Sequence, residues 1–167
     1  YGPDLMLKLC DVGQAQGWRH FFYGGTKDVC DRLSARLQSK FPALNVVGKI
    51  APPYMPKAVP APGDVIDAIN AARPDILWVG LGSPKQDHWI VLNRQALQVP
   101  VIIGIGAAFD FHSGIKPQAP LWMQRSGSEW LFRLGCEPGR LWRRYLVGNS
   151  LFVWWLVCDL FSGRSKS

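Results

Sequence analysis

Three glycine-rich segments of this chain each follow a run of apolar residues and can bring backbone N–H groups close to a ligand. They are Gly24-Gly25-Thr26, GLGSPKQD at 80–87 and GIGAAFD at 104–110. Glycines let an anion approach the backbone, and the dipole of a following helix favours negative charge. The first segment therefore either holds a phosphate or forms a tight turn in which Thr26 caps the next helix. The Gly-Lys-Ser/Thr ending of an ATPase phosphate loop occurs nowhere in the sequence.

Polar side chains in the second and third segments are candidates for direct contact with a ligand. Lys85 and Gln86 are expected to point towards a cleft, and the Gln86 amide offers a donor and an acceptor for sugar hydroxyls. Asp110 lies between two phenylalanines, where an unpaired buried carboxylate is costly. We therefore expect Asp110 to accept hydrogen bonds from a ribose, a base or a sugar. The alternative for both segments is ordinary helix capping.

Arginines are concentrated towards the end of the chain. Those within one stretch of twenty residues are Arg125, Arg133, Arg140, Arg143 and Arg144. Arg133, Arg140 and Arg144 share one face of a continuous helix, although Pro138 favours a break. Guanidinium groups bind phosphate oxygens in pairs, so this cluster suits a diphosphate. The alternative is a basic surface that faces solvent or a membrane.

Histidines and cysteines show no metal-binding or disulfide pattern. His20, His88 and His112 lack ligand spacing, and no zinc motif or Ser-His-Asp order is present. The cysteines are far apart and form no CxxC pair, which suits a reducing cytoplasm. They are Cys10, Cys30, Cys136 and Cys158. No metal or other cofactor is expected.

The composition is that of a folded, basic protein. The chain has 167 residues, of which 48% are hydrophobic and 19% charged, and this excludes a disordered chain. The formal net charge of +7 predicts an anionic partner. Nucleic acid, an acidic membrane surface and a phosphorylated small molecule all satisfy this criterion.

The elements that position the candidate residues alternate between strand and helix. Strands are expected at 18–23, 45–48, 75–79 and 101–105, and helices at 3–17, 27–40, 64–72 and after Pro84. Five prolines make 51–63 a loop. This pattern predicts an α/β fold with a Rossmann-like, mostly parallel sheet and helices on both faces. Ligands bind at the carboxyl ends of such strands, where all three glycine segments lie.

The composition changes near residue 117. We expect a Rossmann-like core at 1–116, a helical Arg- and Trp-rich appendage at 117–146, and an apolar and basic tail at 147–167 that docks on a membrane surface. Even the apolar run 146–161 is shorter than the ~20 residues of a membrane-spanning helix. The other interpretations of the tail are a core helix or a contact in an oligomer.

Several segments in the same order resemble the WecG/TagA/CpsF glycosyltransferases (family 26), which act in bacterial surface polymer synthesis. These segments are 75–87, 104–110, 129–134 and 137–145, and the resemblance runs from about Gly2 to Tyr145. It implies inverting, metal-independent transfer from a UDP-sugar to a polyprenyl-diphosphate-linked acceptor. Expected donors are UDP-N-acetylmannosamine, its uronate or a related hexose. The expected pathways are polysaccharide or teichoic acid synthesis at the inner face of the plasma membrane.

The resemblance also implies roles for particular residues. Gln86 and Asp110 would line the donor pocket beside the Gly24-Gly25 turn, with Asp110 towards the uridine and Tyr54 at the uracil. The C-terminal appendage would close the site and neutralise the diphosphate through Arg133, Arg140 and Arg143.

The family's catalytic base, an aspartate, is expected before Tyr1, so no catalytic residue is assigned within this chain. We therefore expect a fragment or a degenerate copy of such an enzyme, able to bind the donor. The expected partners are the UDP-sugar, the lipid-linked acceptor and an anionic membrane, but not nucleic acid, and a homo-oligomer is possible. The alternatives are a non-catalytic nucleotide-binding module and a membrane-associated scaffold.

Overall fold

The computed structural model describes residues 1–136 and 138–139. It divides the chain into two compact units, Tyr1–Pro117 and Gln118–Ser167. Within the described part, no helix is both long enough and apolar enough to cross a bilayer.

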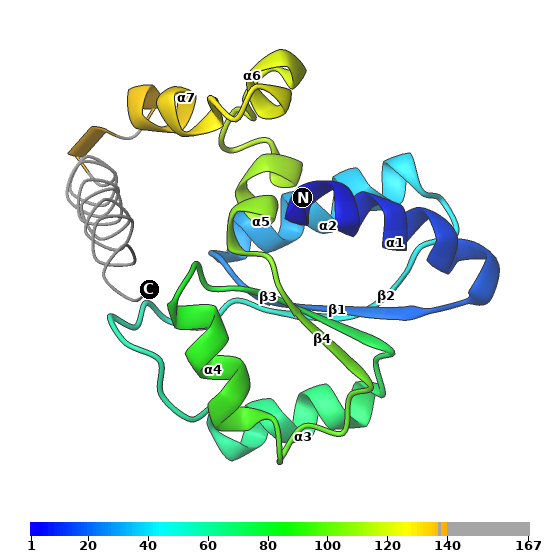
Figure 1. Ribbon diagram of the computed structural model, residues 1–167. Coiled ribbons are helices and arrows are strands. Elements are labelled where there is room, and N and C mark those ends of the chain that lie inside the picture. The colour runs from blue at the N-terminus through cyan, green and yellow to red at the C-terminus, as the bar shows by residue number, and fades with distance from the viewer. Residues whose placement is uncertain (137, 140–167) are drawn as a thin grey trace, which may run out of the picture. The chain divides into compact units, whose positions relative to one another are not determined.

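The first unit is built on a four-stranded sheet (Figure 1). Its strands are β1 (Arg19–Gly24), β2 (Asn45–Ile50), β3 (Ile76–Gly80) and β4 (Val101–Gly104). All neighbouring strands are parallel, and their order is β2-β1-β3-β4. The chain winds outwards from β1 in one direction and from β3 in the other. The topological switch point therefore lies between the carboxyl ends of β1 and β3, which is where such sheets bind ligands.

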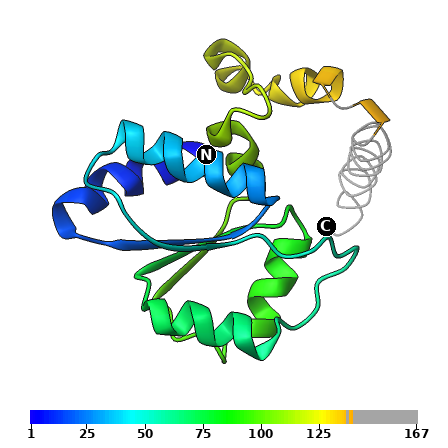
Figure 2. The same ribbon diagram turned by 180° about the vertical axis from the view of Figure 1, so that it is seen from behind.

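Helices cover both faces of the sheet, as Figures 1 and 2 show from opposite sides. One face carries α1 (Gly2–Gln16), α2 (Lys27–Lys40) and α5 (Gly106–Ser113), and the other carries α3 (Gly63–Ala72) and α4 (Lys85–Asn93). Successive strand residues point to opposite faces. In β3, Trp78 joins the first core cluster, whereas Leu77 and Val79 join the second. The predicted α/β fold with a parallel sheet is confirmed.

Local signals explain most element boundaries. Helix α2 has the predicted bounds, and the Thr26 hydroxyl caps it by accepting a hydrogen bond from the Val29 N–H at 3.3 Å. The proline-rich residues 51–62 form no regular element, as expected. Helix α5 was not predicted, because its Gly-Ala-Ala start resembles a turn. Burial of Ala108 and Phe109 stabilises it in the folded chain.

The second unit contains two short helices in its described part, α6 (Leu121–Arg125) and α7 (Glu129–Cys136). The helical pattern expected over 120–145 is therefore interrupted. Gly127 adopts a φ of 72°, and the Ser128 N–H donates to the Met123 carbonyl at 3.0 Å. The tail predicted at 147–167 lies outside the described residues.

Candidate functional site

The floor of the candidate site is bare backbone at the switch point. Gly24 and Gly25 follow β1 with φ values of 130° and 67°. The Gly25 N–H donates to the Gly80 carbonyl at 3.1 Å, and a Cβ on Gly24 would stand 2.5 Å from the Gly80 carbonyl carbon. The ends of β1 and β3 therefore approach too closely for a side chain at Gly24.

The turns after β3 and β4 meet in the same way. Gly82 has a φ of 80°, and a Cβ on Gly106 would stand 2.7 Å from the Gly82 Cα. Three glycine turns thus pack side by side along the carboxyl edge of the sheet. This arrangement brings together the three glycine-rich segments singled out in the sequence.

Gln86 lies at this edge, but its oxygen already has a partner. The side chain is only 7% exposed, and its Oε1 accepts a hydrogen bond from the Gly106 N–H at 2.8 Å. Gln86, a residue of α4, thereby caps the start of α5, because the N-cap residue Ile105 offers no side-chain oxygen. Its Nε2 donates no hydrogen bond within the residues that the structure describes.

The proline-rich loop is fixed to α4 at two points, which the sequence did not reveal. The Lys85 Nζ donates to the Met55 carbonyl at 2.9 Å and lies 5.2 Å from the centre of the Tyr54 ring. At the other end of the helix, the Asn93 Oδ1 accepts from the Ala61 N–H at 2.7 Å. Lys85 thus holds the loop that carries Tyr54. Tyr54 is 88% exposed and available for stacking.

Asp110 lies in the second turn of α5, four residues after Gly106 and so on the same side of the helix. Its carboxylate pairs with the Lys116 ammonium at 2.7 Å and is 29% exposed. Its main-chain oxygen accepts from the Ile115 and Lys116 N–H groups and closes the helix. Asp110 is therefore not the N-cap of a following helix, and its charge is balanced yet reachable.

Several N–H groups at and just before the start of α2 already donate hydrogen bonds within the protein. Gly25 donates to the end of β3, and Val29 donates to the Thr26 hydroxyl. A phosphate at this turn would have to use the N–H groups of Lys27 and Asp28, and the Asp28 carboxylate in the same turn opposes it.

A cysteine thiol also contacts the Gly24-Gly25 turn. The Cys30 Sγ donates to the Gly24 carbonyl at 2.9 Å, and burial raises the pKa of Cys30 to about 11. The group therefore stays a neutral thiol donor near pH 7. The spacing of the cysteines gave no indication of this role, because it depends on burial.

The predicted diphosphate residues belong to the second unit. Arg133 lies in α7, and Arg140 and Arg143 lie outside the described residues. Their proposed role stays a prediction. Over residues 1–136 and 138–139, no three His, Cys, Asp or Glu side chains converge as metal ligands would.

The fold and this edge define a class: a doubly wound α/β protein whose glycine-rich turns pack together at the switch point of its sheet. The glycosyl transferase WecG/TagA/CpsF family model matches residues 1–166, and the chain belongs to this family.

Named relatives agree with this assignment. The chain is similar to the N-acetylglucosaminyldiphosphoundecaprenol N-acetyl-beta-D-mannosaminyltransferase of Bacillus spizizenii, with 35% identity over 87% of the chain and 54% of the relative. Proteins of the same name in Bacillus subtilis and Staphylococcus aureus are 34% and 25% identical, over 87% and 85% of the chain and 54% of each relative. The chain spans about half the length of these relatives.

Proposed function

We propose that this chain supplies the donor-binding part of a glycosyltransferase that moves a sugar from a UDP-sugar to a polyprenyl-diphosphate-linked acceptor. Family membership supports the reaction class. The glycine-rich edge at the switch point supports the location of the binding site. The relatives' name describes an N-acetylmannosaminyl donor group and an N-acetylglucosaminyl-diphosphoundecaprenol acceptor. These are the substrates that we propose first.

The groups at this edge suit the parts of a nucleotide sugar. The Gln86 Nε2 can donate to a sugar oxygen, and the Asp110 carboxylate can accept from a ribose or a base. The exposed Tyr54 ring offers a stacking surface for the base, and Lys85 contacts this ring. Gly24 and Gly25 have no side chains, so the ligand can approach their backbone.

The proposed reaction is a direct displacement with inversion. The acceptor hydroxyl attacks C1 of the sugar from the side opposite UDP, forming the new glycosidic bond as the bond to the diphosphate breaks. Negative charge grows on the leaving diphosphate, so arginines aimed there lower the barrier. We assign this role to Arg133, Arg140 and Arg143. The base that takes the hydroxyl proton is not assigned to any residue of this chain.

Calorimetry tests the donor site directly. We expect UDP to bind the chain in EDTA, because the proposed contacts are an amide, a carboxylate, a ring and the backbone. Binding that appears only after magnesium is added would contradict the metal-free claim. A folded chain that binds UDP under neither condition would rule out the donor site and leave a membrane-associated scaffold as the better description.

The same titration identifies the part played by Asp110. Asp110→Asn keeps the volume and removes the charge, so UDP affinity should fall by roughly 1–3 kcal/mol if a charged hydrogen bond is lost. This variant also breaks the ion pair with Lys116. Lys116→Gln is the matched control, since it breaks that pair but keeps the carboxylate. Equal losses in the two variants would assign Asp110 to structure rather than to donor binding.

We further propose that residues 147–167 dock on an anionic membrane, which would confine the enzyme to the surface that holds its lipid-linked acceptor. Interfacial tryptophans and nearby arginines favour such docking. Binding to anionic vesicles should weaken with salt and fall sharply when residues 147–167 are removed. Flotation measures both effects. A folded, truncated chain that floats as well as the full chain would contradict this role.

A further inference from the structure

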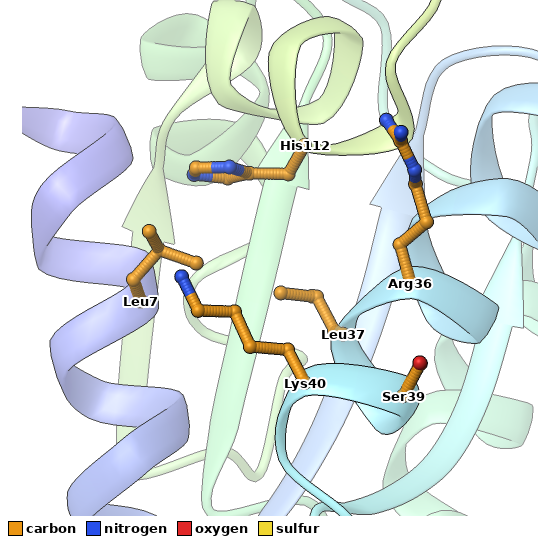
Figure 3. Close-up of a pocket in the computed structure, with 6 residues that line it drawn as sticks. All are labelled: Leu7, Arg36, Leu37, Ser39, Lys40 and His112. Atoms are coloured by element: carbon orange, nitrogen blue, oxygen red, sulfur yellow. The ribbon is translucent and has the colours of Figure 1, made fainter.

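A hollow of about 340 Å³ lies on the helical face formed by α1, α2 and α5, apart from the glycine-built edge. Figure 3 shows α1 on one side, α2 on the other and α5 above. Its lining residues are Leu7, Arg36, Leu37, Ser39, Lys40 and His112. Apolar walls and a basic, hydroxyl-bearing rim thus come together from three helices.

Two cations of α2 at this hollow lack the acidic partners that its other cations have. Lys27 pairs with Asp31 at 3.0 Å, and Arg32 pairs with Asp28 at 2.9 Å. Within the part of the chain that the structure describes, Arg36 and Lys40 pair with no carboxylate.

Arg36 and Lys40 are one turn apart on α2 and extend on either side of Leu37 (Figure 3). Like charges at this spacing repel each other. The dipole of α2 favours Lys40 in its last turn, but gives no comparable reason for Arg36. A bound anion between them would remove the repulsion.

The Arg36 guanidinium lies against the turn that ends α5. Gly114 ends α5 with a φ of 75°, and a Cβ at this position would overlap the Arg36 guanidinium group. The guanidinium therefore lies directly against the Gly114 backbone. Its five N–H donors are held as a rigid fork, which suits phosphate oxygens.

His112 completes the basic rim from α5. Its Nε2 lies 2.9 Å from the Pro3 carbonyl, which can only accept, so this nitrogen carries the hydrogen. The Nδ1 is then the nitrogen that gains a proton when the ring becomes charged. Burial lowers the pKa of His112, the Pro3 carbonyl raises it, the Lys40 charge lowers it and the Asp4 carboxylate raises it. Burial is the largest of these effects, so the pKa of His112 is lowered overall, and an anion in the hollow would raise it.

We propose that this hollow binds a phosphate group, either on a small soluble phosphate ester or on a lipid headgroup. The cationic groups of Arg36 and Lys40 would hold the phosphate oxygens, and Leu7 and Leu37 would contact the carbon part of the ligand. Arg36 lies nine residues along α2 from its start at the carboxyl edge, or about 13 Å. None of the residues that line the hollow is among those proposed for the donor site.

The test follows the His112 imidazole by NMR, with the signal assigned by comparison with His112→Gln. In the full chain, its pKa should be higher in phosphate than in chloride at equal ionic strength. The variant Arg36→Gln/Lys40→Gln should weaken phosphate binding about tenfold or more. Lys27→Gln/Arg32→Gln removes the same charge from the same helix and should change the affinity by less than about twofold. UDP binding at the carboxyl edge of the sheet should be the same in the Arg36→Gln/Lys40→Gln variant as in the unmodified chain, so failure of the donor proposal does not affect the His112 readout.

Vesicles distinguish the two sources of phosphate. If the ligand is a headgroup, phosphatidic acid in phosphatidylcholine vesicles should shift the His112 signal more than free phosphate does, and the Arg36→Gln/Lys40→Gln variant should lose this response. If it is a soluble ester, glycerol phosphate should shift the signal and the vesicles should not. An unchanged His112 pKa in phosphate, glycerol phosphate and vesicles would overturn the proposal. Equal phosphate affinity in the two double variants would also overturn it.

Discussion

Replacing Gly24 by alanine should destabilise the first unit by about 3 kcal/mol or more and remove UDP binding. Two separate effects add at this position. The φ of 130° is strained for any residue with a Cβ, and that Cβ would stand 2.5 Å from the Gly80 carbonyl carbon. Moving the two strand ends apart would lengthen the hydrogen bond from the Gly25 N–H to the Gly80 carbonyl. Urea unfolding of the full chain measures the loss.

Two other glycines separate these effects. Gly17 has a φ of 65° with nothing within 4 Å of a Cβ, so Gly17→Ala should cost only the conformational term of about 1 kcal/mol. Gly63 begins α3 without a positive φ and with equally open space, so Gly63→Ala should be neutral or stabilising by up to about 1 kcal/mol. If Gly24→Ala cost no more than Gly17→Ala, the close approach of β1 and β3 would be wrong.

The strands and their order along the chain could be predicted because each signal was local. The runs 76–79 and 101–105 are wholly apolar and too short for helices. The first became the inner strand β3 and the second the edge strand β4. Glycines after each run marked the ends of β1, β3 and β4. Strand order is not a local property, so the switch point between β1 and β3 became visible only in the structure.

The contacts of the candidate side chains were not predictable, because they join residues far apart in sequence. Gln86 and Gly106 are twenty residues apart, and Lys85 and Met55 are thirty apart. From sequence, both polar residues were expected to face a ligand. In the structure, the Gln86 oxygen contacts the start of α5 and the Lys85 ammonium contacts the proline-rich loop. The carboxyl edge thus presents Tyr54, the Gln86 nitrogen and Asp110 from elements that these two residues hold in place.

His20 is another residue whose importance depends on burial. It is fully buried at the amino end of β1, and its Nδ1 accepts a hydrogen bond from the Trp78 indole N–H at 3.0 Å. Its Nε2 has no hydrogen-bond partner among the described residues, and a Cβ on Gly13 would stand 3.0 Å from it. Burial lowers the pKa of His20 to about 4, and the Asp75 charge offsets this only in part. The folded chain therefore keeps a neutral imidazole where the unfolded chain becomes protonated.

The free energy of unfolding should accordingly fall as the pH is lowered from about 6.5 to 4. Over this range the unfolded state binds a proton at His20 that the folded state does not, so stability rises with pH and is lost on acidification. A shift from 6.5 to about 4 corresponds to about 3 kcal/mol at the lower pH. The lowered pKa of Asp75, caused by its hydrogen bonds to Arg19, acts below this range, since its ordinary value is 3.8. The two contributions are therefore separated in pH.

Urea unfolding at several pH values between 7 and 4 measures the slope. His20→Gln removes the titrating group and should flatten the dependence, although stability at pH 7 falls because the Trp78 hydrogen bond is changed. His112, whose pKa is also lowered by burial, contributes with the same sign, so His112→Gln should remove a further part of the slope. His88 is exposed, and His88→Gln is the matched control for exchanging a histidine for glutamine. A folded His20→Gln variant with the wild-type slope would show that the acid sensitivity lies elsewhere.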